Sequence, residues 1–169
     1  PIHQVFIFHG ILHDENMKPE KRLGDFNPQS FLNVIKANSL TPLLWVKALT
    51  PILASKHKCK ITVFSARVGS ISDNQLGGWY SYRASKSALN MMLKTAAIEL
   101  ARRAKNIKLI SFHPGTTDTK LSKPFQNNVP KEKLFTCEFA AKQLLSTVEK
   151  TQVDGKLSYL DWQGKTIPW

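Results

Sequence analysis

The sequence predicts an α/β fold in which a parallel sheet of about four strands is flanked by helices. Short apolar runs alternate along the chain with stretches that carry apolar residues at helical spacing. Strands separated by helices pair in parallel through right-handed crossovers. The carboxyl ends of such strands gather ligand-binding residues at one edge of the sheet. The 169 residues are expected to form one domain, 1–169.

Each predicted element has its own signal in the sequence. Apolar runs bounded by loop residues predict strands, and apolar residues three and four apart predict helices. The predicted elements are, in order, strand 5–8, a helix from Pro28 to about Pro51, strand 61–64, a long helix from about 79 to 104, strand 107–112, a helix opened by Thr136, and strand 156–162. Asn27 is suited to cap the first helix, because its side chain accepts a backbone N–H and Pro28 needs no partner. Residues 116–130 are predicted to form a loop.

Composition excludes several classes of protein. The net charge is +12, but the basic residues are dispersed, so we do not expect nucleic-acid binding. Cys59 and Cys137 lie far apart and suit a reducing cytoplasm. The apolar runs are too short to span a membrane, and the five histidines lack companion ligands at metal-binding spacing, so neither a membrane nor a metal is expected. The chain enters a strand directly after Pro1, so we expect its natural start to lie upstream.

Tyr82 and Lys86 are the first candidates for chemistry. They lie four residues apart on the long predicted helix, a spacing that puts both side chains on one face. A free tyrosine titrates at about 10, but a nearby ammonium stabilises the phenolate and lowers that pKa. The pair is therefore suited to acid/base work on a carbonyl or an alcohol. Taken alone, the spacing more often reflects a surface lysine beside an amphipathic tyrosine.

The surroundings of this pair resemble the short-chain dehydrogenase/reductase family. Residues 82–90 resemble its active-site helix, 63–70 the strand and loop that deliver its catalytic serine, and 113–119 its Pro-Gly loop. Residues 10–13 and 77–80 resemble the C-factor-like branch. The resemblance implies a partial Rossmann-like, doubly wound parallel sheet with family strands 4-5-6-7. The chain would be the C-terminal catalytic part, because the family's N-terminal glycine-rich cofactor segment has no counterpart in the sequence.

The resemblance implies hydride transfer between NAD(P) and a small carbonyl or alcohol substrate. Tyr82 would be the acid/base, and Lys86 would hold the nicotinamide ribose and lower the pKa of Tyr82. Asn38 resembles the helix asparagine whose carbonyl holds a relay water. Pro42 has no N–H, so it would free the Asn38 carbonyl from its helical bond. A simple kink, with Asn38 facing solvent, is the alternative.

The sequence departs from the family pattern mainly at the position of the catalytic serine. Its position is occupied by Ala66, and either Ser65 or Ser70 would have to substitute. We prefer Ser70, which follows on the loop side. The cofactor-binding residues that the resemblance implies are Gly10, Tyr82, Lys86, Pro114, Gly115, Thr117 and Thr119.

Cofactor and partners follow from the same resemblance. The cofactor is NAD(P), with NADP preferred, and a homo-oligomer is expected through the long helix and its neighbour. The sequence does not identify the substrate. The alternative is a non-catalytic binding or signalling module derived from this fold, which Ala66, the missing cofactor segment and the basic charge favour.

Overall fold

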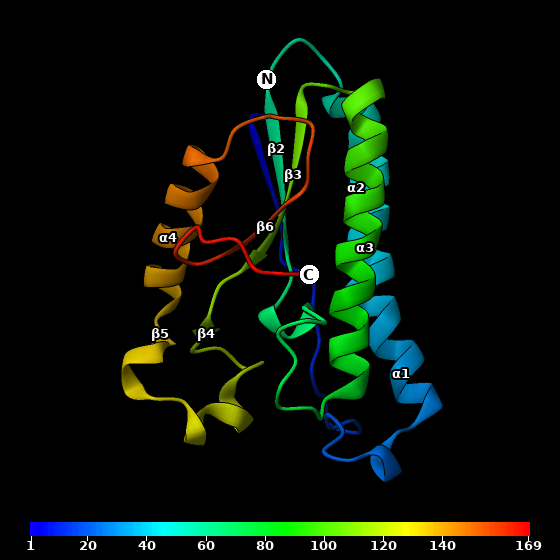
Figure 1. Ribbon diagram of the computed structural model, residues 1–169, viewed down its shortest axis with the longest axis vertical. Helices are drawn as coiled ribbons and strands as arrows, with labels where there is room; N and C mark the ends of the chain where they lie inside the picture. The colour runs from blue at the N-terminus through cyan, green and yellow to red at the C-terminus, as the bar shows by residue number, and fades with distance from the viewer.

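The computed structural model describes residues 1–169 and confirms the predicted α/β architecture (Figure 1). Four parallel strands form one sheet in the order β1-β2-β3-β6. The strands are β1 (Gln4–Ile7), β2 (Cys59–Phe64), β3 (Ile107–His113) and β6 (Ser158–Asp161). The helices are α1 (Pro28–Ile35), α2 (Thr41–Leu53), α3 (Tyr80–Arg103) and α4 (Cys137–Lys150). None of the helices is both long and apolar enough to cross a membrane.

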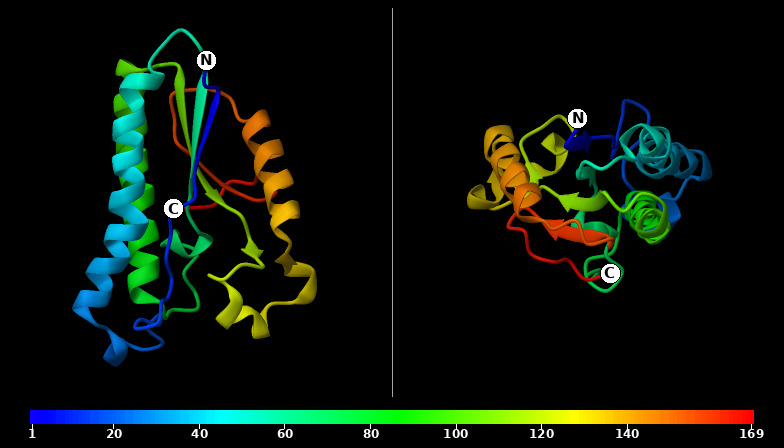
Figure 2. Two further views of the ribbon diagram at one scale, coloured as in Figure 1. Left: turned by 180° about the vertical axis from the view of Figure 1, so that it is seen from behind. Right: turned by 90° about the horizontal axis from the view of Figure 1, so that it is seen from above.

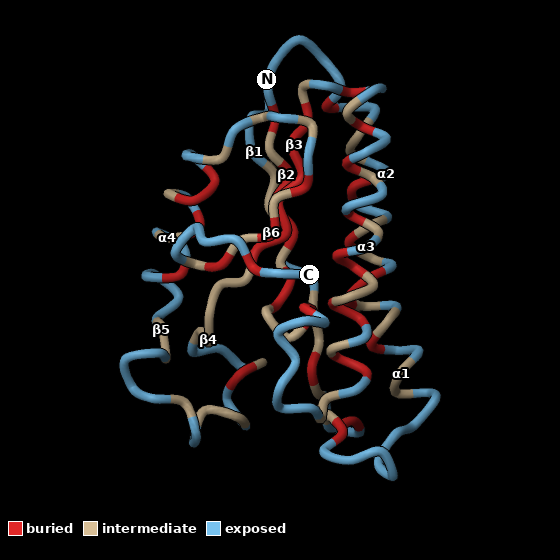
Figure 3. The backbone as a smooth tube through the Cα atoms, viewed as in Figure 1, coloured by how far each residue is buried: buried red, intermediate tan, exposed pale blue.

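The helices cover both faces of the sheet. Helices α2 and α3 lie on one face and α4 lies on the other (Figure 2). The larger core cluster of 14 buried residues joins the sheet to α2 and α3, and a cluster of four joins it to α4. Burial accordingly follows the strands and the inward sides of α2 and α3 (Figure 3). Strand β1 pairs only with β2, so one edge of the sheet is open.

The helix predicted from Pro28 to about Pro51 is interrupted by a π turn. Asn27 caps it as expected, its Oδ1 accepting the N–H of Ser30 at 2.9 Å. A π turn then occupies Lys36–Leu40 between α1 and α2, and the N–H of Thr41 donates to the carbonyl of Lys36. The cause lies in the sequence, because Pro42 offers no N–H to a carbonyl four residues earlier.

The segment predicted as a loop between 116 and 130 contains regular structure. Strand β4 (Thr116–Thr117) pairs in parallel with β5 (Leu134–Phe135), and a 3₁₀ helix spans Lys123–Asn128. Gly115 begins this segment with a φ of 77°, and a Cβ there would lie 2.5 Å from the Phe135 ring. Only glycine fits so close to the Phe135 ring with a positive φ. The turn at Gly115 directs the chain away from β3, and the segment that follows forms one side of a cavity.

Candidate active site

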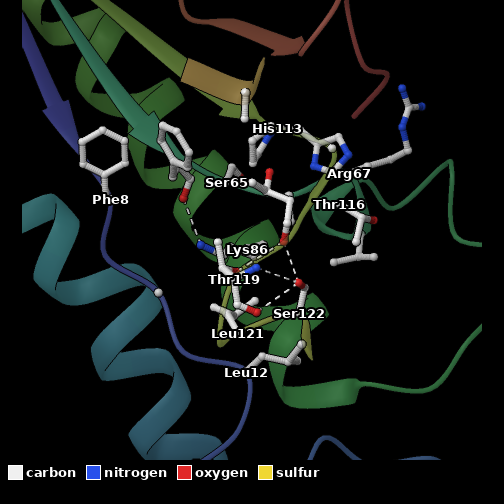
Figure 4. Close-up of a pocket in the computed structure, with 18 of the residues that line it drawn as sticks. Phe8, Leu12, Ser65, Arg67, Lys86, His113, Thr116, Thr119, Leu121 and Ser122 are labelled. Carbon is white, nitrogen blue, oxygen red and sulfur yellow. Dashed lines mark hydrogen bonds between the residues drawn. The ribbon is translucent and has the colours of Figure 1, made fainter. Parts of the chain in front are cut away.

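A cavity of about 630 Å³ opens at the carboxyl ends of the strands. The residues that follow β1 and β2, the end of β3, the start of α3, the segment after Gly115 and the first turns of α4 all border it. Figure 4 shows side chains from these separate segments converging on the same space. This is the edge at which a parallel sheet is expected to collect its ligand-binding residues.

Tyr82 and Lys86 meet at this cavity as the sequence predicted. Both line it and both are buried, with exposed fractions of 8% and 2%. The Lys86 Nζ lies 5.7 Å from the centroid of the Tyr82 ring. It also donates a 2.9 Å hydrogen bond to the carbonyl of Phe64 at the end of β2, drawn as a dashed line in Figure 4. Helix α3 therefore presents a phenol and an ammonium together at the tip of the sheet.

Burial controls the protonation of this pair. Desolvation, with a smaller contribution from the Tyr159 phenol, raises the pKa of Tyr82 to about 12. Desolvation likewise lowers the pKa of Lys86 to about 8. The shift of the Tyr82 pKa is thus opposite to the lowering expected from the lysine, because loss of hydration outweighs the attraction of the ammonium. At neutral pH the site holds a neutral phenol beside a cation, the protonation state that can donate a proton to a carbonyl.

Asn38 is fully buried and does not face solvent, so the simple-kink alternative is wrong. Its Oδ1 accepts the N–H of Ile11 at 2.6 Å, and its Nδ2 donates to the carbonyl of Ile11 at 2.9 Å and to the hydroxyl of Ser85 at 3.0 Å. The side chain therefore ties the segment after β1 to α3, one residue before Lys86. The Asn38 carbonyl lies in the π turn that Pro42 imposes.

The preference for Ser70 over Ser65 needs correction. The Ser70 hydroxyl accepts the N–H of Asp73 at 3.1 Å and lies outside the cavity lining, because the 3₁₀ turn Arg67–Gly69 turns the chain away. Ser65 does line the cavity, and its hydroxyl donates to Asn90 Oδ1 at 2.9 Å. Ala66 also lines it, so a methyl group borders the cavity at the position that the resemblance assigns to the family serine.

The five other cofactor-binding candidates, Gly10, Pro114, Gly115, Thr117 and Thr119, all border the cavity. A Cβ at Gly10 would lie 3.3 Å from the Lys86 Nζ and 3.7 Å from Asn38 Oδ1, so the absence of a side chain leaves the approach to the lysine open. The hydroxyl of Thr117 is buried without a hydrogen-bond partner. Buried polar atoms are normally paired, so this hydroxyl is suited to a ligand that enters the cavity.

His113 is a site residue that sequence reasoning treated only as the end of a strand. It borders the cavity, and its Nδ1 is buried without a partner. Burial, assisted by the nearby Arg67 guanidinium, lowers the pKa of His113 to about 4, so the imidazole is neutral at physiological pH. The position of His113 directly before the Pro-Gly turn was the only signal in the sequence that could have placed it at the cavity.

A second group of missed residues forms the side of the cavity next to Tyr82. Leu12, Trp79, Leu121 and Phe125 border the cavity there. The Trp79 ring lies 6.0 Å from that of Tyr82 and 5.1 Å from that of Phe125, between ring centroids. No local pattern could have identified this group, because its members come from three segments that only the fold brings together.

Comparison with known proteins supports the same family. Residues 10–130 match the sequence profile described as short chain dehydrogenase. The chain is 32% identical over 137 residues to the 1-hydroxy-2-glutathionyl-2-methyl-3-butene dehydrogenase of Rhodococcus sp. (strain AD45), covering 80% of this chain and 57% of that protein. It is 26% identical over 147 residues to the C-signal of Myxococcus xanthus, covering 87% and 83% of the two chains.

Solved structures agree on the fold. The carbonyl reductase Sniffer of D. melanogaster superposes with a TM-score of 0.80 at 24% identity, and an NADP-bound short-chain dehydrogenase/reductase from Burkholderia multivorans with 0.79 at 24%. Each comparison covers 98% of this chain and 66% of the other. The chain thus spans 57% of the first curated relative and about two thirds of these structures.

Proposed function

The chain belongs to the short-chain dehydrogenase family, and from this premise we propose that it is the catalytic part of an NAD(P)-dependent oxidoreductase acting on a carbonyl or alcohol. The observation that carries the proposal is the buried Tyr82–Lys86 pair that lines a cavity at the strand ends. A buried phenol and a buried ammonium are costly to maintain without a use for them.

The residues of the pair have distinct tasks. When bound, NAD(P)H supplies the hydride. The Tyr82 hydroxyl gives its proton to the carbonyl oxygen of the substrate and takes it back in the reverse direction. Lys86 keeps a positive charge beside the phenol and so stabilises the phenolate that proton transfer creates. Its bond to the Phe64 carbonyl holds the ammonium in place between turnovers.

The cavity fits the nicotinamide-ribose half of the cofactor. The open approach at Gly10 leads to Lys86, and the unpaired Thr117 hydroxyl is available to an amide. Pro114, Gly115 and Thr119 would complete this subsite. The sequence has no glycine-rich turn for the pyrophosphate. NADP is preferred, since the net charge of +12 suits an additional phosphate and a structural neighbour carries NADP.

Cofactor binding and turnover test the proposal in sequence. NADPH is titrated against the chain by fluorescence, and a panel of carbonyl compounds is then assayed with wild-type and Tyr82→Phe protein. We expect saturable NADPH binding that Lys86→Met weakens, and turnover that Tyr82→Phe removes. Equal turnover by wild-type and Tyr82→Phe protein would eliminate Tyr82 as the acid/base.

A non-catalytic binding or signalling module is the second candidate. It is favoured by the methyl group of Ala66 at the serine position and by the similarity to C-signal over 83% of that protein. The module predicts a folded chain with an intact cavity but without NADPH-dependent turnover of any carbonyl. The same titration and panel therefore distinguish the two candidates.

A further inference from the structure

The side of the cavity next to Tyr82 is lined by apolar and aromatic groups. Leu12 is 4% exposed and packs in one cluster with Ala66 and Tyr82. Trp79 and Phe125 meet edge to face, with their ring planes 64° apart. Both rings border the cavity, and an aromatic ligand gains edge-to-face or offset-stacked contacts with such rings beyond the area it buries. We call the group Leu12, Trp79, Leu121 and Phe125 the aromatic wall.

The backbone of Trp79 is held in an unusual conformation. Its φ of 53° and ψ of 44° lie in the left-handed region, and it is the sole non-glycine residue with positive φ. Such strain persists only where surrounding contacts enforce it, and it clusters at functional sites. Here the Trp79 N–H donates to the carbonyl of Glu20 at 2.6 Å, and the Trp79 carbonyl accepts the N–H of Arg83 at 2.9 Å. The strained backbone places the indole against Tyr82 and Phe125.

The two residues of the aromatic wall that follow β4, Leu121 and Phe125, are held in place by contacts with His13. His13 Nε2 lies 3.1 Å from the carbonyl of Leu121, and the His13 ring meets that of Phe125 at 5.6 Å. These contacts join the segment after β1 to the segment after β4. The aromatic wall is therefore assembled before a ligand enters, which reduces the entropy lost on binding.

The Arg67 guanidinium, one of the two cationic groups that line the cavity, is already paired with carboxylates. Arg67 contacts Asp161 at 3.1 Å and Asp73 at 3.5 Å. The Lys86 ammonium donates to the Phe64 carbonyl. The four residues of the aromatic wall carry no charge, so a substrate carboxylate packed against them would lose its hydration there without gaining a cation, and that loss opposes binding.

We propose that the aromatic wall selects an uncharged carbonyl compound whose carbonyl carbon bears an aromatic ring, with Trp79 as the specificity-determining residue. The aryl ring would pack against Trp79 and Phe125 while the carbonyl oxygen faces the Tyr82 hydroxyl. The orientation of the carbonyl rests on the proposed function, but the preference for the aryl group rests on the aromatic wall alone.

Binding without cofactor tests this preference. Ligand-observed NMR titrations of the chain compare acetophenone with cyclohexyl methyl ketone, which has a similar size but no π system, and with 4-acetylbenzoate, which adds a carboxylate. We expect acetophenone to bind about 3- to 10-fold more tightly than either compound. Trp79→Leu should abolish the preference and Trp79→Phe should keep most of it. Trp45→Leu, on the outer side of α2 and away from the cavity, is the matched control and should leave the preference for acetophenone unchanged.

The outcomes separate this proposal from hydride transfer. Equal affinity for acetophenone and 4-acetylbenzoate, or an unchanged preference in folded Trp79→Leu protein, overturns the role of the aromatic wall. If a thermal melt shows that Trp79→Leu is unfolded, Phe125→Leu takes its place in the same comparison. A preference for the aryl ketone without NADPH-dependent turnover would support the proposed specificity and reject the oxidoreductase function. Turnover of aliphatic ketones without a preference for the aryl ketone would support the oxidoreductase function and reject the proposed specificity.

Discussion

The Lys86 ammonium nitrogen lies 5.7 Å from the centroid of the Tyr82 ring, one turn away on the same face of α3. Because both groups are buried, water does not solvate the charged form of either one. Burial favours the neutral form of each, which raises the pKa of the phenol and lowers that of the amine. The ammonium is consequently close to titrating in the range where enzymes are assayed, and the phenol is not.

Replacing Tyr82 with Phe should remove activity while leaving the fold intact. The Tyr82 ring packs against Leu12 and Ala66, and Phe retains that packing. Loss of the proton donor should lower kcat by about 100-fold or more. Steady-state reduction of a carbonyl with NADPH measures this loss, and a thermal melt with an unchanged Tm confirms that the fold is kept. A kcat within a few-fold of wild type would contradict the assignment.

Replacing Ala66 with Ser should increase activity. Ala66 borders the cavity at the position of the family serine, so a hydroxyl there would donate to the substrate carbonyl as negative charge develops. We expect kcat/KM for a carbonyl substrate to rise roughly tenfold. Ala141→Ser, which adds a hydroxyl elsewhere in the same cavity, is the control and should have little effect. Similar gains in both variants would show that the position of the hydroxyl is irrelevant.

Carbonyl reduction should lose activity as the pH rises above about 8. Reduction requires a neutral Tyr82, whose pKa is about 12, and a charged Lys86, whose pKa is about 8. Lys86 therefore deprotonates first, and the phenolate formed at Tyr82 loses its nearby charge. A profile of kcat/KM between pH 6 and pH 10 should be flat below about 8 and fall above it. A profile that rises through this range would contradict the assignment of Lys86.

The same pKa predicts a pH-dependent stability. The Lys86 amine titrates at about 8 in the folded chain, against 10.5 for its ordinary value. Between these values the unfolded state binds more protons, so the free energy of unfolding rises with pH by roughly 3 kcal/mol. As the pH falls from 10.5 to about 8, this gain in the free energy of unfolding is lost. Urea unfolding from pH 7 to pH 10 should show the rise in wild-type protein relative to Lys86→Met. Parallel curves for the two proteins would indicate that the burial of Lys86 has no such cost.

The order of the main elements was predictable because each carries a local signal. Periodicity located the strands and helices, and the caps at Asn27 and Thr136 are observed. Strands β4 and β5 were not predicted, because two residues are too few for a periodic pattern and their pairing depends on the turn at Gly115. Fold class is thus encoded over short stretches, whereas the side of the cavity around β4 is not.

The candidate site was predictable to a lesser degree. Tyr82 and Lys86 share a helix, so their spacing alone placed them together. The preference for Ser70 was wrong because the 3₁₀ turn after Ala66 decides which hydroxyl faces the cavity, and no periodic pattern indicates that turn. The pKa of Tyr82 also could not be inferred, because it depends on burial by residues distant in sequence.

The outer sides of α2 and α3 should form an interface between two copies of the chain. The homo-oligomer implied by the family resemblance needs an apolar surface there, and a group of large apolar side chains is exposed on these helices: Leu44, Trp45, Ile52, Met91 and Ile98. Exposed apolar groups gathered on neighbouring helices favour association. In a two-fold dimer the same patch serves both subunits, so one charge per chain is introduced twice at the interface.

Light scattering coupled to size-exclusion chromatography measures the mass of the chain in solution and so tests this interface. We expect wild-type chain to elute as an oligomer, and Leu44→Glu or Ile98→Glu to shift it to the mass of a single chain, 19.1 kDa. Ile71→Glu, at an exposed position outside both helices, should leave the mass unchanged. Because Leu44 and Ile98 are 48% and 54% exposed in the single chain, their replacement should cost little folding stability. A wild-type chain that already elutes at the mass of one copy would remove the basis for assigning this surface to self-association.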